Sequence, residues 1–217
     1  ALHWGAIFPA RVLRIAAVCG SARASDYNIV FLDSLRSALL ADPSIRCREG
    51  RLQVSGTCSA GLRALAHIYA GWGVSLEFYR HETWRLSSRD GKPFTSRDDF
   101  VERSYVGGFA GGNPLNLLAQ VDTWKSADIS KAHGMPSGAS MKEALGRITA
   151  NVYFMPCTTD RYFTVEETRQ EADCIPTCKF APIPSVWGHR GGDPHRPGQE
   201  AEAAFLKEHV TELLSSS

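Results

Sequence analysis

The chain has 217 residues, of which 43% are hydrophobic and 22% are charged, the composition of a globular protein with a buried core. The 24 lysine and arginine residues balance the 23 aspartate and glutamate residues, and no run of one charge indicates a surface for nucleic acid or for an anionic membrane. No apolar run approaches the roughly 18 residues that a membrane-spanning helix needs. Composition therefore excludes these classes and names no partner.

The six cysteines are spread along the chain without the paired CxxC spacing of a zinc site. We therefore predict no metal site, and mostly reduced thiols in an intracellular protein. One alternative stays open, which is a disulfide bond across the short loop between Cys174 and Cys178.

The first half of the chain begins with a short apolar helix predicted over 1–8. The near-continuous apolar run of 12–19 predicts a strand that is buried on both faces, as in a parallel sheet. An amphipathic helix follows, whose apolar residues recur at helical spacing: Ile29, Leu32, Leu35 and Leu39. From 44 to 140 glycine, tryptophan, tyrosine and arginine become frequent and strand-like runs disappear. We predict a largely helical insertion over 44–140. Insertions of this size at strand ends are where α/β enzymes usually build a lid or substrate pocket.

The second half returns to alternating elements. Strands are predicted over 148–155 and 180–183, with a helix between them that starts at a capping box formed by Thr164 and Glu167. A final amphipathic helix is predicted over 200–214. Because each parallel crossover needs a helix to return the chain, this alternation predicts one α/β domain over 1–217 with a mostly parallel sheet.

Two polar residues follow neighbouring strands of this predicted sheet. Asp160 lies in TTDRYF directly after one strand, and His189 lies in SVWGHRGG directly after the next. Both side chains can then reach the same edge of the sheet, where a carboxylate would fix the histidine in one tautomer and make it a general base. Taken singly, a loop aspartate is more often a turn former and a loop histidine a surface residue. Their joint placement favours a catalytic pair.

The nucleophile that such a pair would serve is missing from the sequence. The elbow pattern G-x-S-x-G does not occur, and the stretch GTCSAG, residues 56–61, has one residue too many and lies in the insertion. Ser21 and Cys157 follow strands but lie on the wrong elements for an elbow. The sequence therefore predicts an acid and a base without their nucleophile.

Several stretches carry a resemblance to a known family. ALHWGAIFPARVLRIAAVCGSAR, DYNIVFLDSLRSALLADP, MPCTTDRYFTVEE and IPSVWGHRGG resemble the homoserine O-acetyltransferase-like group of α/β-hydrolases, and YAGWGVSLEFYR and LLAQVDTWKSADIS resemble the lid of its hydrolase-like branch. The resemblance covers nearly the whole chain. It implies an α/β-hydrolase fold, no cofactor, and a C-terminal fragment whose nucleophilic serine stands a few residues before Ala1.

The expected function is therefore that of a serine hydrolase acting on an ester or thioester. Two alternatives stay open: an acyl-CoA-dependent O-acyltransferase, and a non-catalytic α/β module that binds a partner or a small acyl ligand. The acetyltransferases commonly carry an aspartate after the catalytic histidine to hold the substrate amine, whereas this chain has Arg190. A cation there would repel an amine, so homoserine is not the expected substrate.

Four residues are candidates for substrate binding, each with a structural alternative. Arg190 and Arg23 would pair with a carboxylate substrate or form structural salt bridges. Trp72 and Tyr79 would line an acyl pocket or simply pack in the lid. A narrower resemblance, to α/β-hydrolase-domain proteins of fungal toxin and secondary-metabolite clusters, implies a peroxisomal location. The chain ends without the Ser-Lys-Leu signal, so a cytoplasmic location is the other expectation.

Overall fold

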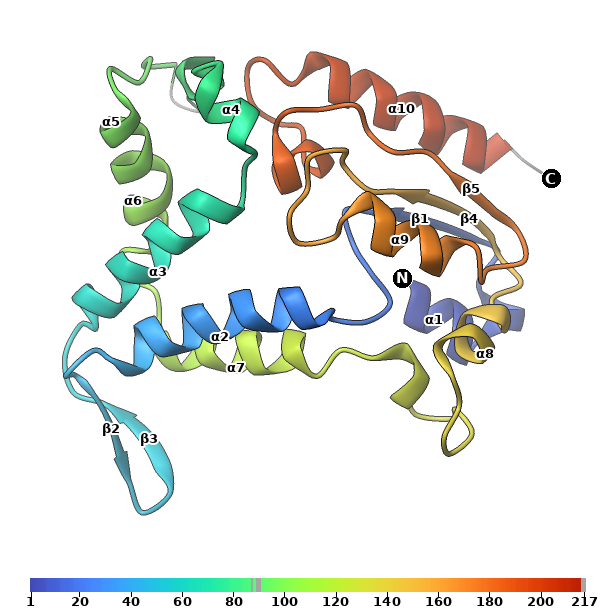
Figure 1. Ribbon diagram of the computed structural model, residues 1–217, viewed down its shortest axis with the longest axis horizontal. Coiled ribbons are helices and arrows are strands. Elements are labelled where there is room, and N and C mark those ends of the chain that lie inside the picture. The colour runs from blue at the N-terminus through green and yellow to red at the C-terminus, as the bar shows by residue number, and fades with distance from the viewer. Residues whose placement is uncertain (87, 89–90, 216–217) are drawn as a thin grey trace. The chain divides into compact units, whose positions relative to one another are not determined.

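The computed structural model describes residues 1–86, 88 and 91–215 (Figure 1). The chain divides into two compact units. Unit 1 consists of Ala1–Arg23, Gly73–His81 and Ala127–Ser217, and unit 2 consists of Ala24–Trp72 and Glu82–Ser126.

Unit 1 is built on a three-stranded parallel sheet. Its strands are β1 (Arg14–Val18), β4 (Asn151–Met155) and β5 (Cys178–Phe180), in the order β1-β4-β5. In this register Val18 lies opposite Met155 and Phe154 lies opposite Phe180, so the carboxyl ends of neighbouring strands meet at one edge. The predicted α/β class with a parallel sheet is confirmed.

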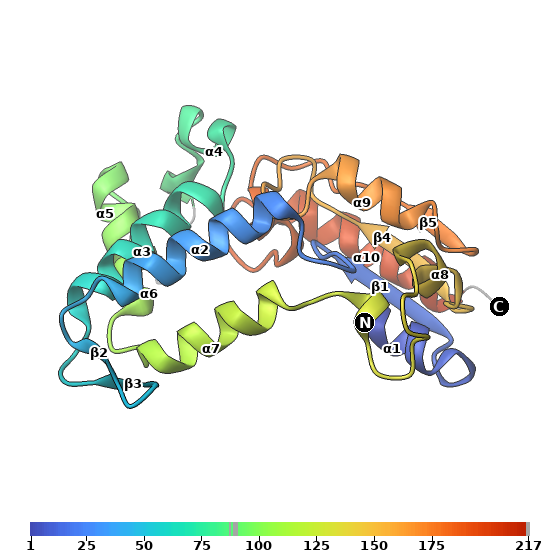
Figure 2. The same ribbon diagram turned by 60° about the horizontal axis from the view of Figure 1, so that its bottom comes forward.

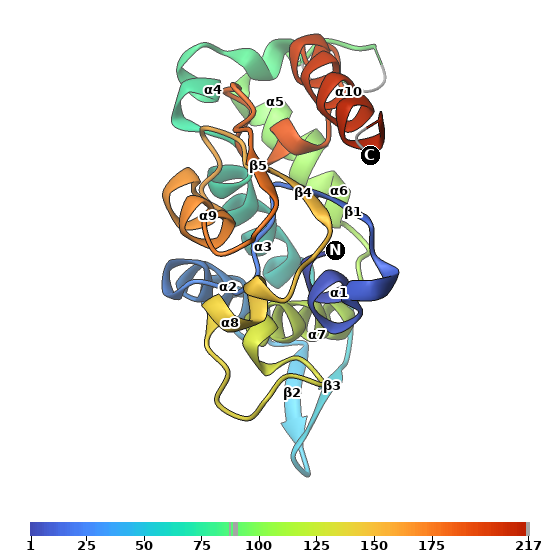
Figure 3. The same cartoon turned by 90° about the vertical axis from the view of Figure 1, so that its right-hand side faces the viewer.

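Helices cover both faces of this sheet (Figure 3). Successive side chains of the central strand point to opposite faces, so each face has side chains to bury. Val152 and Phe154 join a buried cluster with α1 (Leu2–Ile7), α8 (Met141–Gly146) and α9 (Val165–Ala172). Tyr153 and Met155 join a second cluster, against α10 (Glu200–Ser215). The remaining elements of unit 1 are short helices: η1 (Pro9–Arg11), α4 (Leu76–Arg80), η4 (Ile129–Lys131) and η5 (Gly188–Gly192).

Unit 2 is mainly helical. Its long helices α2 (Asp26–Leu40), α3 (Ser59–Trp72) and α7 (Pro114–Lys125) pack together, with α3 and α7 both against α2 (Figure 2). Phe31 is fully buried at their junction, with its ring 4.8 Å from that of Trp72 and 6.1 Å from that of Trp124. The shorter helices are η2 (Thr83–Leu86), α5 (Arg97–Val101), η3 (Glu102–Val106) and α6 (Gly107–Phe109).

Residues 44–140, predicted to be largely helical, also contain two short strands. An antiparallel hairpin is present, formed by β2 (Ile45–Arg48) and β3 (Arg51–Val54). Its two-residue turn, Glu49 and Gly50, has positive φ at both positions, the backbone that such hairpins favour. Most of its residues are exposed and many are charged, so the apolar alternation that signals a half-buried strand is weak.

One other predicted boundary differs in the structure. The third strand ends at Phe180, and Ile183 makes an isolated bridge with Cys157. The N–H groups of Ala181 and Ile183 still donate to the carbonyls of Phe154 and Pro156, but Pro156 has no N–H to donate in return, which breaks the ladder. Unit 2 includes α2 as well as part of 44–140, and the insertion over 44–140 stays a prediction. Among the described residues, no helix combines the length and apolar character that a bilayer span requires.

Candidate active site

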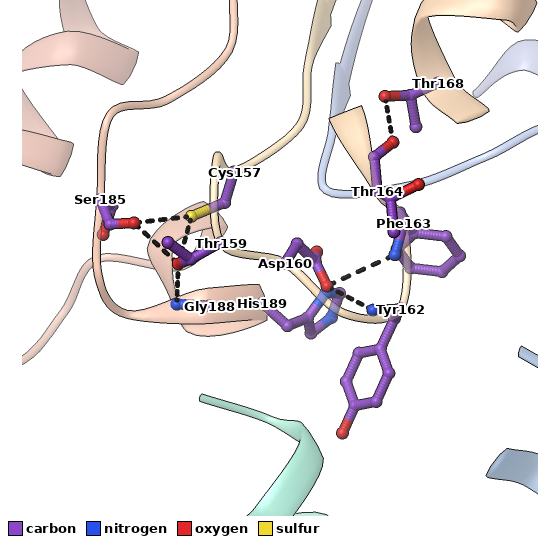
Figure 4. A network of polar contacts seen from close by, with 10 residues as sticks. All are labelled: Cys157, Thr159, Asp160, Tyr162, Phe163, Thr164, Thr168, Ser185, Gly188 and His189. Atoms are coloured by element: carbon purple, nitrogen blue, oxygen red, sulfur yellow. Dashed lines mark hydrogen bonds and ion pairs between the residues drawn. The ribbon is translucent and has the colours of Figure 1, made fainter. Parts of the chain in front are cut away.

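Asp160 lies in the turn after β4, and the backbone that follows it fixes its carboxylate. Its Oδ1 accepts hydrogen bonds from the backbone N–H of Tyr162 at 2.8 Å and of Phe163 at 3.4 Å (Figure 4). Aspartate favours such turns because its short side chain reaches the N–H two residues on. The side chain is completely buried, and Oδ2 is left for a partner outside this turn.

That partner is His189, at the start of η5. The imidazole Nδ1 lies 2.9 Å from Oδ2 of Asp160. An ionised carboxylate can only accept, so Nδ1 donates its proton and Nε2 keeps its lone pair. The histidine side chain is 37% exposed, whereas that of the aspartate is 0% exposed. A buried acid behind an accessible imidazole is the arrangement in which histidine can act as a general base.

Two aromatic rings from the acid loop lie beside this imidazole. The ring centroids of Tyr162 and Phe163 are 5.0 Å and 5.6 Å from that of His189. Both residues follow Asp160 closely in sequence, so one loop supplies the carboxylate and the walls around the base.

The backbone before His189 requires glycine. Gly188 has a φ of +60°, and a Cβ there would lie 2.8 Å from the Cα of Val74. The segment containing Val74 is tied to the same loop by Ser75, whose hydroxyl donates to the carbonyl of Val186 at 2.6 Å. The histidine loop is therefore braced by a close contact that a larger residue would disrupt.

Glycines after the histidine allow the cysteines of the neighbouring strand ends to approach. A Cβ on Gly191 would lie 2.9 Å from Sγ of Cys157, and one on Gly192 would lie 2.6 Å from Sγ of Cys19. Both contacts would be too short for real atoms. The run GHRGG is therefore explained by tight packing at the sheet edge.

Cys19 is a neighbour of Asp160 and His189 that sequence reasoning missed. Its Sγ, a carboxylate oxygen of Asp160 and a ring nitrogen of His189 all lie within 4.8 Å of one another. The thiol is 7% exposed, and burial, followed by the nearby Asp160 carboxylate, raises its pKa above the ordinary value. Its place directly after β1, the strand beside β4, was the available signal.

The trio of Cys19, Asp160 and His189 does not favour a nucleophile or a preformed metal site. A buried thiol with a raised pKa is mostly uncharged, whereas both roles require the thiolate. The Nδ1 of His189 is also already bonded to the carboxylate, which would have to separate to admit an ion.

The other candidate nucleophiles have structural roles. Ser21 donates its hydroxyl to the carbonyl of Arg23 at 2.8 Å, and the thiol of Cys157 is fully buried beside the carbonyl of Ser185. The stretch 56–61 does join a strand to a helix, β3 to α3, contrary to expectation. Its Cys58 has positive φ but is 1% exposed, and burial, with the Asp42 carboxylate, raises the pKa of the thiol.

The two candidate arginines lie in different parts of unit 1. Arg23 is exposed and forms an isolated bridge with Asp128, while the adjacent Ala22 N–H donates to Glu171 at 2.8 Å. Arg190 follows His189 in η5 and is half-buried, with its carbonyl accepting from Nε2 of Gln199 at 2.8 Å. Both positions have clear backbone roles.

The two candidate aromatic residues belong to different units. Trp72 ends α3 in unit 2, where its ring packs 4.9 Å from that of Tyr27. Tyr79 lies on α4 in unit 1, with its ring 5.6 Å from that of Phe78. Packing partners are therefore present for both.

All six cysteines are free, including Cys174 and Cys178.

The parallel sheet, the helices on both faces, and the acid and histidine on successive strand-end loops define the α/β-hydrolase fold. Solved structures agree with this class. An acetylester hydrolase from Corynebacterium glutamicum superposes with a TM-score of 0.84 at 27% identity, over 99% of this chain and 58% of that one. An α/β-hydrolase from a deep-sea metagenome, at 14% identity, shares the fold with a TM-score of 0.66 over 100% of this chain and 61% of that one.

Curated relatives are enzymes of acyl chemistry. The chain is 34% identical over 215 residues to an ethyl acetate hydrolase of Pseudomonas veronii, covering 99% of this chain and 57% of that protein. It is 26% identical over 222 residues to a homoserine O-acetyltransferase of Geobacter sulfurreducens, covering 97% of this chain and 54% of that protein. No family model matches the chain. This chain spans little more than half the length of these two relatives.

Proposed function

We propose that the complete protein is a serine esterase that hydrolyses small acyl esters, with His189 as the general base and Asp160 as the acid that orients it. The main support is the 2.9 Å contact between Nδ1 of His189 and the buried Oδ2 of Asp160. The similarity to an ethyl acetate hydrolase and to an acetylester hydrolase favours a short acyl group.

In the proposed reaction, Nε2 of His189 removes the proton of a serine hydroxyl as its oxygen bonds to the ester carbonyl carbon. The bond from that carbon to the alkoxy oxygen then breaks, and the alcohol leaves with the proton from Nε2. In the second half, a water molecule loses a proton to Nε2 as its oxygen bonds to the same carbonyl carbon. The bond from that carbon to the serine oxygen then breaks, the acid leaves, and the serine oxygen takes the proton from Nε2. Asp160 stabilises the imidazolium that forms in each half.

The proposal places the serine before Ala1 in the complete protein, as the family resemblance implies. The described serines and cysteines that we considered have structural roles or raised thiol pKa values, which favours a nucleophile elsewhere. Reading the coding DNA upstream tests this part of the proposal. An in-frame G-x-S-x-G within about ten codons supports it, and an in-frame stop codon in that interval contradicts it.

The activity is tested in the product of the complete reading frame with ethyl acetate and p-nitrophenyl acetate. His189→Ala should lower kcat by about three orders of magnitude or more. His195→Ala is the matched control, because His195 lies 3.0 Å from Asp193 in another histidine–aspartate pair whose aspartate is exposed. The control should retain full activity. Equal activity in the two variants would refute the proposed role of His189.

A second candidate function is acyl transfer from acyl-CoA, which the similarity to a homoserine O-acetyltransferase favours. The two reactions share the acyl-enzyme and differ in whether water or another alcohol releases the acyl group. Measuring acetyl-CoA consumption with and without an alcohol acceptor separates them. An acceptor-dependent rate far above the ester hydrolysis rate would favour transfer, whereas binding without turnover would favour the non-catalytic module.

The finer parts of the proposal concern the substrate and its setting. Arg190 and Arg23 would bind a carboxylate on the substrate, Trp72 and Tyr79 would line the acyl pocket, and the insertion over 44–140 would act as a lid. Measuring KM for a neutral ester and for a matched ester bearing a carboxylate, in the wild type and Arg190→Gln, tests the first role. A function in fungal toxin or secondary-metabolite synthesis and a peroxisomal location stay predictions.

A further inference from the structure

The acid loop and the histidine loop are joined at a second point, one residue before the pair itself. Thr159 precedes Asp160, and Gly188 precedes His189. The backbone N–H of Gly188 donates a hydrogen bond to Oγ1 of Thr159 at 3.1 Å (Figure 4). This bond runs beside the contact between Asp160 and His189, so the two loops meet in register at successive residues.

The Thr159 hydroxyl has two further partners, the carbonyl of Ser185 and, at 3.7 Å, Sγ of Cys157. It donates to the carbonyl of Ser185 at 2.7 Å, and Ser185 lies upstream of the histidine in the same loop. A hydroxyl has one proton to donate, so its lone pairs face the Gly188 N–H when that proton points to Ser185. One side chain thereby binds the histidine loop at two places.

The Gly188 N–H needs this partner. Gly188 is the first residue of η5, and the first N–H groups of a helix have no acceptor within the helix. Its positive φ and its close approach to Val74 restrict the backbone to one path. Loss of the Thr159 oxygen would leave the N–H unsatisfied and free the peptide that positions the imidazole.

Thr158 makes similar contacts without this link. Its hydroxyl donates to the carbonyl of Ser185 at 3.2 Å and accepts from the N–H of Ser185 at 3.2 Å. Both threonines therefore tie the acid loop to Ser185, but the hydrogen bond from Gly188 goes to Thr159. The neighbouring threonine is a matched internal control.

We propose that Thr159 is a positioning residue, which holds the histidine loop through Gly188 so that Nδ1–H of His189 faces Asp160. The assignment of a base to His189 rests on the proposed function. The positioning itself concerns a tautomer and a hydrogen bond, which are measurable without substrate.

The test uses the product of the complete reading frame, labelled with 15N, and NMR of the His189 ring and the Gly188 amide. Thr159→Val removes the hydroxyl at nearly constant volume, Thr159→Ser keeps it, and Thr158→Val removes the control hydroxyl. The wild type, Thr159→Ser and Thr158→Val should show one tautomer with the proton on Nδ1. Thr159→Val should show mixed tautomers, and its Gly188 amide should exchange with water at least about tenfold faster.

Unchanged tautomer and exchange in Thr159→Val would overturn the proposal. If Thr159→Val does not fold, the exchange rate of the Gly188 amide in the wild type decides. An amide that exchanges as fast as an exposed loop amide would also overturn the proposal. An amide that is protected in the wild type and stays protected in Thr159→Ser would support it. A complete protein without esterase activity would refute the proposed function and leave these measurements standing.

Discussion

Oε2 of Glu171 on α9 accepts a hydrogen bond from the backbone N–H of Ala22 at 2.8 Å, which joins that helix to the loop after β1. Burial raises the pKa of this carboxyl from 4.5 to about 7, although the N–H groups of Ala22 and Arg23 oppose the shift. The folded state therefore holds the proton to higher pH than the unfolded state does.

The first prediction concerns the pH dependence of stability. Between pH 4.5 and 7 the folded protein binds more protons at Glu171 than the unfolded chain, so the free energy of unfolding falls as pH rises through this window. At 1.36 kcal/mol per pKa unit the loss is about 3 kcal/mol. The free energy of unfolding is measured with urea from pH 4 to 8 for the wild type and for Glu171→Gln. The difference between the two proteins should change by this amount over that range. Parallel curves would contradict the prediction.

The second prediction separates the chemistry of Asp160 from its local structure. Asp160→Asn keeps an oxygen for the Tyr162 N–H but places the amide NH2 group opposite Nδ1 of His189. We expect kcat of the complete enzyme to fall by about 10⁴, as in serine proteases with this change. The melting temperature should change little. Asp193→Asn, at the exposed pair, should leave kcat unchanged, and a similar loss there would show that the effect is not specific.

The third prediction concerns the close approach before the histidine. Gly188→Ala places a Cβ 2.8 Å from the Cα of Val74 at a residue with φ of +60°. Gly138→Ala is the control for backbone strain, because Gly138 has φ of +77° and nothing within 4 Å of the added atom. We expect the free energy of unfolding, measured by chemical denaturation, to fall by about 1 kcal/mol in the control. In Gly188→Ala it should fall by at least about 2 kcal/mol more. Equal losses would mean that the loop relaxes around the new atom.

The fourth prediction concerns the thiols. Cys47 is exposed on the β2–β3 hairpin, whereas Cys19, Cys58 and Cys157 are buried. Cys47 should therefore react rapidly with a thiol reagent in the folded protein, and the three buried residues should react only as the protein unfolds. Titration with DTNB of the wild type and Cys47→Ser measures this. A fast phase that persists unchanged in Cys47→Ser would contradict the exposure of Cys47.

Sequence patterns predicted most of the sheet unit because its signals are local. The apolar run around β1 and the spacing of Asp160 after β4 follow from residues next to one another. The hairpin was missed because its strands are exposed and charged. The third strand was predicted over 180–183, whereas it runs over Cys178–Phe180 and its ladder breaks opposite Pro156, which has no N–H. Burial and ladder hydrogen bonds, which decide those cases, depend on neighbours that are distant in sequence.

The amino-acid sequence by itself determined the fold class, the strand-end positions of the acid and the histidine, and the glycines around them. Each depends on short-range preferences such as apolar periodicity and turn formation. Only the tertiary structure decided that Oδ2 of Asp160 meets Nδ1 of His189, that Cys19 lies beside them, and that Thr159 rather than Thr158 reaches Gly188. These contacts join residues that are close only after the parallel strands pair, because pairing brings their carboxyl ends to one edge.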